Sequence, residues 1–144
     1  MTHRLFRLSS AVLLAGLAVA AQARDARDAR QPFESEVARL AGRDARQCGI
    51  VAFGKDGTAA WTCSQAAERA GRAWWVAVEG GGEDSLVGHA AIRTAAGKHI
   101  LLDYDSSPFG SGLYPRFTTT TCPWPVAYDA KRPMPFECNA PSPP

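Results

Sequence analysis

The segment 85–105 constrains the fold most strongly, because it predicts a β-hairpin with one acceptable register. Two β-rich runs flank residues 95–97 (AAG), which predict a three-residue loop with Gly97 in the left-handed conformation. A two-residue loop would instead place Arg93 opposite Ile100 and mix polar with apolar residues on each face. The predicted pairs are Ile92–Ile100, Ala90–Leu102 and Gly88–Tyr104 on a buried face, and Arg93–His99, Ala91–Leu101 and His89–Asp103 on a solvated face.

Two helices and further strands are predicted around this hairpin. Apolar residues at i, i+4, i+7 and i+8 from Phe33 predict a helix beginning at Pro32. A second helix, from Thr58 to Gly71, carries a stripe of small side chains. Strands are expected over 48–54, 73–79, 85–94, 98–105 and, as a threonine-rich edge strand, 116–122. This order indicates an α+β fold, with a small antiparallel sheet of four to five strands and two helices on one face.

The four cysteines predict a disulfide framework. Cys48, Cys63, Cys122 and Cys138 allow three connectivities, and pairing in sequence order closes two loops of similar length. In the chain-entropy treatment each such loop stabilises a small core by about 3 kcal/mol. The spacing lacks a C-x-x-C pair, so we expect no zinc site, and no cofactor is predicted.

The two ends of the chain predict export. Residues 1–23 combine arginines, a short apolar run and a small-x-small site, which is typical of a secretory signal peptide. The apolar run is shorter than the roughly 20 residues of a bilayer-spanning helix, so we expect no membrane span after cleavage. We further expect a disordered mature N-terminus (24–31), a single α+β domain (32–122) and a proline-rich tail (123–144) held by a disulfide. The predicted location is the periplasm or the extracellular medium.

The charge balance argues against nucleic acid as a partner. Arg4 and Arg7 belong to the predicted signal peptide, which leaves 14 basic residues against 14 acidic residues in the mature chain. A formally neutral chain lacks the basic surface that nucleic-acid binding requires.

The solvated face of the hairpin carries the candidate catalytic residues, His89 and Asp103. A carboxylate beside an imidazole fixes its tautomer and raises its basicity, as a general base requires. Arg93 and His99 lie further along this face and can position an anion. No nucleophile or metal completes a catalytic set here, so a simple cross-strand contact remains the alternative.

A second carboxylate, Asp105, is expected on the same face as Asp103. A calcium loop of the EF-hand kind would need glycine where Pro108 stands and glutamate where Tyr114 stands, so that motif is excluded. A looser calcium or magnesium site that uses both aspartates stays open, although we predict no metal.

Trp75 suggests an alternative function for the protein, the binding of a ligand without catalysis. Trp74 and Trp75 are adjacent on a strand and must face opposite sides. Val76 and Val78 share the side of Trp74, so Trp74 is predicted in the core and Trp75 on the solvated face. An exposed indole near charged groups suits sugar or protein binding, unless the proline-rich tail covers it.

These observations favour a small exported, disulfide-bonded, non-catalytic module, of ligand-binding, protein-binding or inhibitor type. It would act through the open sheet face on an envelope or extracellular protein or a glycan. The predicted ligand-binding residues are Trp75, Arg93, His99 and Asp105. One alternative is a small cell-envelope hydrolase with His89 as general base oriented by Asp103; the other is a structural envelope protein.

Overall fold

The computed structural model describes residues 29–82, 84–108, 114–132 and 134–139. The predicted signal peptide and residues 24–28 of the predicted disordered segment lie outside these ranges. The N-terminal helix occupies residues 29–41, so its described part already begins three residues before Pro32. The remaining elements are β1 (Arg46–Val51), α2 (Thr58–Arg69), β2 (Trp74–Gly81), β3 (Leu86–Arg93), β4 (His99–Asp105), β5 (Arg116–Cys122), β6 (Val126–Tyr128) and β7 (Phe136–Cys138).

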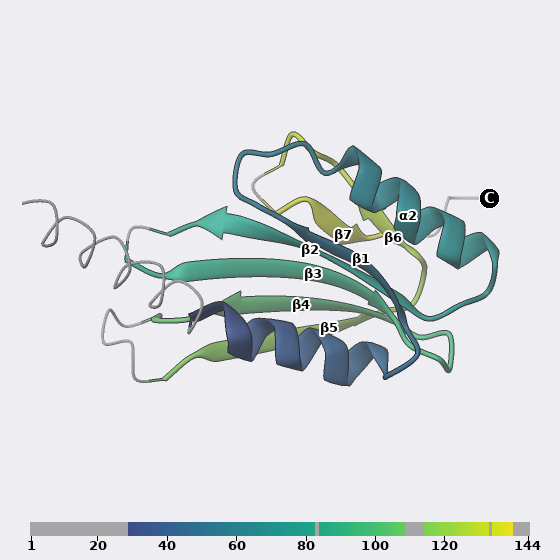
Figure 1. Cartoon of the computed structure of the whole chain (residues 1–144), viewed down its shortest axis with the longest axis horizontal. Helices are drawn as coiled ribbons and strands as arrows, with labels where there is room; N and C mark the ends of the chain where they lie inside the picture. Colours follow the sequence, from purple (N-terminus) through teal and green to yellow (C-terminus); the bar gives the residue numbers. More distant parts are fainter. Residues whose placement is uncertain (1–28, 83, 109–113, 133, 140–144) are drawn as a thin grey trace, which may run out of the picture.

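The main sheet has five strands in the order β1-β2-β3-β4-β5, and β6 and β7 form a separate two-stranded sheet (Figure 1). The predicted α+β class and the number of strands are therefore confirmed. The prediction of an antiparallel sheet is wrong at one edge, because β1 pairs in parallel with β2. The two strands are joined through α2, and a helical crossover of this kind brings consecutive strands side by side in parallel.

The predicted register of the central hairpin is confirmed in full. All six expected pairs occur between β3 and β4, including Ile92–Ile100 and His89–Asp103. The loop residue Gly97 has φ +78°, and its N–H donates to the Thr94 carbonyl at 2.9 Å. The left-handed glycine thus sets the alignment of both strands.

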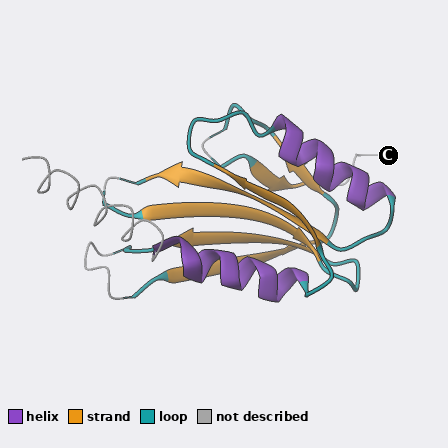
Figure 2. Ribbon diagram, viewed as in Figure 1, coloured by secondary structure: helices purple, strands orange, loops and turns teal. Residues whose placement is uncertain are grey.

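The two helices cover opposite faces of the sheet, which corrects the prediction that they share one face. The N-terminal helix buries Phe33 and Val37 in a core that contains Trp75. On the other side, Ala67 of α2 packs in a second core that contains Trp74. Figure 2 shows the two helices over different parts of the sheet. The physical reason is that β2 buries consecutive residues on both its sides, so each face needs a covering layer.

The proline-rich C-terminal segment contributes to the second core through β6 and β7, although the sequence suggested only an irregular tail. Tyr128 of β6 and Phe136 of β7 pack against Trp61 of α2, with ring centroids 5.4 and 6.1 Å from the indole. Prolines confine each strand to three residues. Aromatic contacts therefore attach this hairpin to the face of the sheet that α2 covers.

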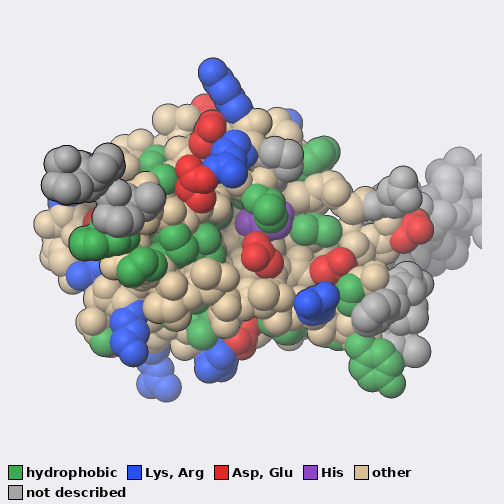
Figure 3. All heavy atoms as spheres, turned by 180° about the vertical axis from the view of Figure 1, so that it is seen from behind, with side chains coloured by type: hydrophobic (Ala, Val, Ile, Leu, Met, Phe, Trp, Pro, Cys, Tyr) green, Lys and Arg blue, Asp and Glu red, His purple; other side chains and the backbone are tan. Residues whose placement is uncertain are grey.

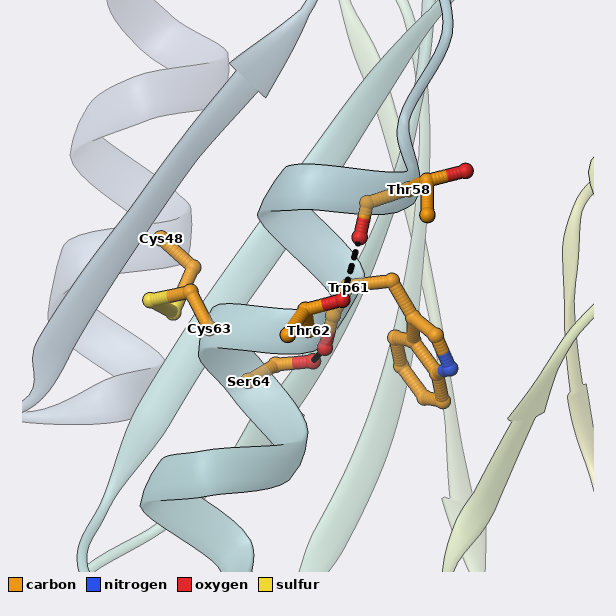
Figure 4. The surroundings of a disulfide bond; sticks show 6 residues. All are labelled: Cys48, Thr58, Trp61, Thr62, Cys63 and Ser64. Atoms are coloured by element: carbon orange, nitrogen blue, oxygen red, sulfur yellow. Dashed lines mark hydrogen bonds between the residues drawn. A yellow bond between two sulfur atoms is a disulfide. The ribbon is translucent and has the colours of Figure 1, made fainter.

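Both predicted disulfides are present. Cys48 of β1 pairs with Cys63 of α2, and Cys122 of β5 pairs with Cys138 of β7, with Cα–Cα distances of 5.6 and 5.2 Å. In Figure 4 the first disulfide and the Trp61 indole extend from different sides of α2. Helix α2 is thus held to β1 by a covalent bond on one side and to the hairpin by aromatic packing on the other.

Candidate functional site

His89 and Asp103 form the pair that the hairpin register predicts. His89 Nδ1 lies 2.8 Å from Asp103 Oδ1. The imidazole is buried in the sheet, whereas the Asp103 side chain is 48% exposed. Because an ionised carboxylate only accepts hydrogen bonds, this contact requires an N–H on Nδ1, which in a neutral imidazole makes Nε2 the acceptor.

This pair borders a hollow of about 240 Å³ between the main sheet and the β6–β7 hairpin. Figure 3 shows the face opposite the N-terminal helix, where a histidine side chain lies near the centre beside acidic and hydrophobic groups. The hollow is lined by His89, Ala90, Leu101, Asp103, Arg132, Met134, Phe136, Glu137 and Cys138. The lining residues of the β6–β7 hairpin were not identified from the sequence, because no local pattern in the C-terminal segment shows where that segment folds back.

Trp75 lies on the other face of the sheet, and its predicted role beside His89 is wrong. Strand β2 pairs Trp75 with Ile92 and Val78 with His89, so Trp74 is the tryptophan on the His89 face. Trp75 is only 8% exposed and packs in the core beneath the N-terminal helix. One face of the sheet was expected to be solvated, but core residues pack on both faces, and Trp74 and Trp75 are both buried.

Arg93 and His99 lie on the predicted face, but their anion is a residue of the protein itself. His99 Nε2 is 3.0 Å from Glu68 Oε2, and Arg93 Nε is 3.3 Å from Glu68 Oε1. Arg93 also donates from Nη1 to the Gly71 carbonyl at 2.9 Å. These contacts hold the C-terminal end of α2 against the sheet. The side chains of Arg93 and His99 therefore bind Glu68 and do not line the hollow.

Glu68, the carboxylate that Arg93 and His99 contact, was also missed from the sequence, and it lies outside the hollow. Burial raises the pKa of its carboxyl group, but hydrogen bonds from His99 and Trp74 and the charges of His99 and Arg93 outweigh that effect and hold the pKa below 4.5. One local signal was available, since an acidic residue in the last turn of a helix opposes the helix dipole. Such a residue needs compensating donors from elsewhere in the fold.

Asp105 lies on the same strand and face as Asp103, at the point where β4 ends. Its Oδ1 accepts a hydrogen bond from the Ser107 backbone N–H at 2.9 Å, which orders the start of the following loop. It does not line the hollow. Within the described ranges, no group of three or more His, Cys, Asp or Glu side chains is placed to hold a metal ion.

In the part of the chain that the structure describes, no helix is long and apolar enough to cross a membrane. Comparison with known proteins gives no match to a family model, to a curated protein or to a solved structure. Function is therefore inferred from the residues that line the hollow and from their chemistry.

Proposed function

We propose that this protein is an exported binding module, and that its hollow takes up a lysine or arginine side chain of an envelope or extracellular protein. The observation that carries the proposal is the His89–Asp103 pair at the border of this hollow. Two disulfides within one small domain support export, because such bonds persist in oxidising compartments.

Among the described lining residues of the hollow, two carboxylates (Asp103 and Glu137) stand against one guanidinium (Arg132). Asp103 makes no hydrogen bond or ion pair within the described residues other than that with His89. Arg132, the one lysine or arginine among the described lining residues, is already paired with the carboxylate of Glu137. A ligand that brings its own N–H donors and a positive charge therefore complements the site.

The apolar lining residues suit the stem of a long basic side chain. Leu101, Met134 and Phe136 lie beside the carboxylates in the same hollow. Lysine and arginine bury their methylene groups against apolar surface while their charged ends reach polar partners. A glycan receives less support, because Trp75, the expected stacking platform, is buried on the other face.

A nuclear magnetic resonance titration tests the proposal. The ¹⁵N-labelled protein is titrated with N-acetyl-lysine methylamide, and with N-acetyl-norleucine methylamide as the probe that keeps the stem but lacks the ammonium group. We expect the lysine probe to shift amide signals at His89, Asp103 and the residues of β7, and the norleucine probe to leave them in place.

Asp103→Asn and Asp105→Asn provide matched variants. Both remove one negative charge from β4, but only Asp103 lines the hollow. We expect Asp103→Asn to weaken binding of the lysine probe at least about tenfold and Asp105→Asn to leave it nearly unchanged. Equal affinities of the two variants, or equal shifts with the norleucine probe, would contradict the proposal.

The His89–Asp103 hydrogen bond also supports a second candidate, a small envelope hydrolase with His89 as general base. This candidate lacks a nucleophile at the site, since the described lining residues include no serine, and Cys138 is in a disulfide. The loop residue Ser106 already accepts a hydrogen bond from the Leu86 N–H at 2.8 Å. Hydrolysis of p-nitrophenyl acetate that disappears in His89→Ala would favour the hydrolase over the binding module.

A further inference from the structure

We propose that β5 is a self-association surface, through which two copies of this chain join their sheets edge to edge in antiparallel orientation. Strand β5 is the last strand of the five-stranded sheet, and within the described residues no other strand pairs with its outer side (Figure 1). Its residues from Arg116 to Thr121 are all exposed. This inference does not depend on the proposed hollow.

The outer side of β5 presents a regular set of backbone groups that no other described strand pairs with. The Thr94 N–H donates to the Lys98 carbonyl at 2.9 Å, which makes this the closing hydrogen-bonded pair of the β3–β4 hairpin. Hydrogen-bonded and non-hydrogen-bonded pairs alternate along antiparallel strands, and neither the β3–β4 nor the β4–β5 register contains a shift. The alternation turns the N–H and C=O groups of Phe117, Thr119 and Thr121 away from β4.

If a twofold axis passes beside Thr119, all of these backbone groups can form hydrogen bonds with the same strand of a second copy. In that register Thr119 of one copy lies opposite Thr119 of the other, and Phe117 lies opposite Thr121. Each of these pairs can exchange two backbone hydrogen bonds. On the other face Thr118 lies opposite Thr120, and threonine pairs across strands stabilise a sheet.

The features that protect natural edge strands are missing from the middle of β5. Lysine, proline and bulges commonly prevent edge pairing, but the stretch 117–121 reads FTTTT. The one charge in the strand, Arg116, lies at its end and meets Cys122 of the second copy in the proposed register. No like charges oppose one another within the joined strands.

Exposed aromatic residues at both ends of β5 favour a second copy over an unrelated peptide. Tyr114, which precedes the strand, is 73% exposed, and Trp124, which follows it, is 48% exposed. Antiparallel pairing about Thr119 brings the Tyr114 end of one copy to the Trp124 end of the other. At both ends of the paired strands, the dimer would thus bury apolar surface that a single molecule exposes to water.

Sedimentation equilibrium of the full protein over 1–500 µM tests this surface. We expect the mass to rise with concentration towards twice that of the monomer. Thr119→Lys should shift the dissociation constant at least about tenfold to higher concentration, because two ammonium groups would then lie opposite each other across the axis. The matched control, Thr118→Lys, faces a threonine in the second copy and should associate like the unchanged protein.

Thr119→Cys tests the register separately from the affinity. Cα atoms in a hydrogen-bonded antiparallel pair are about 5.5 Å apart, within the range of a disulfide. We therefore expect a covalent dimer under oxidising conditions for Thr119→Cys and little for Thr118→Cys, with native circular dichroism for both. A protein that stays monomeric at 500 µM, or equal effects of the two lysine variants, would overturn the proposal.

Discussion

The indole N–H of Trp74 donates a hydrogen bond to Glu68, with 2.7 Å between Nε1 and Oε2. This contact joins the last turn of α2 to the first residue of β2, and His99 from β4 shares the same carboxylate oxygen. One acidic side chain thus connects three elements across the face opposite the N-terminal helix.

Glu68→Ala should destabilise the fold by about 1–3 kcal/mol, because it leaves the buried Trp74 N–H without its acceptor. Glu68→Gln keeps an oxygen in place and should cost less. Urea unfolding followed by tryptophan fluorescence measures both values. Equal losses for the two variants would show that the negative charge of Glu68 matters and that an acceptor oxygen for Trp74 does not.

The stability of the protein should also depend on the ionisation of Glu68. Its folded pKa is held below 4.5, so the carboxylate stabilises the fold above that pH, and this contribution is lost as the pH falls through the folded value. Glu68→Gln removes the titrating group. We expect the difference in unfolding free energy between the two proteins to be largest above pH 5 and to shrink towards pH 3. A difference that stays constant from pH 7 to pH 3 would be inconsistent with the lowered pKa.

The packing of the N-terminal helix against the sheet should require a glycine at position 88. A Cβ atom there would lie 2.7 Å from two ring atoms of Phe33, which is fully buried. Gly88→Ala should therefore cost about 1–3 kcal/mol through overpacking. Gly80→Ala is the matched control, since its Cβ would meet Val87 at 3.4 Å, and we expect a change within about 0.5 kcal/mol. Thermal unfolding of both variants makes the comparison.

The two disulfides close loops of similar length, with separations of 15 and 16 residues. Removing one or the other should nevertheless loosen different elements of the fold. Each should stabilise the fold by about 3 kcal/mol. Replacing Cys122 and Cys138 together by serine should also raise hydrogen exchange in β7, because that bond attaches β7 to β5. The corresponding double variant at Cys48 and Cys63 should raise exchange in α2 instead. The opposite distribution of exchange would refute this assignment.

The sequence predicted the central hairpin because its register follows from local features, the length of the loop and the position of Gly97. It also predicted both disulfides from the order of the cysteines. It could not predict which face each helix covers, because β2 is apolar on both sides. That ambiguity led to the wrong assignment of Trp75, whose neighbours above the sheet come from the N-terminal helix.

The contacts of Glu68 were beyond sequence reasoning for a different reason. His99 lies 31 residues away along the chain, and nothing near Glu68 identifies it as the partner. The hollow likewise requires that β7 folds back over β3 and β4. In both cases the geometry arises from packing between distant segments, which local patterns do not report.

The tautomers of the two described histidines provide the most direct test of the pairing between His89 and Asp103. His89 contacts a carboxylate through Nδ1, whereas His99 contacts one through Nε2. A long-range ¹H–¹⁵N correlation spectrum of the imidazole rings at pH 8.5, where an ordinary imidazole is neutral, distinguishes the two forms. We predict the proton on Nδ1 of His89 and on Nε2 of His99. A proton on Nε2 of His89 would contradict the pairing with Asp103 on which the proposed binding site depends.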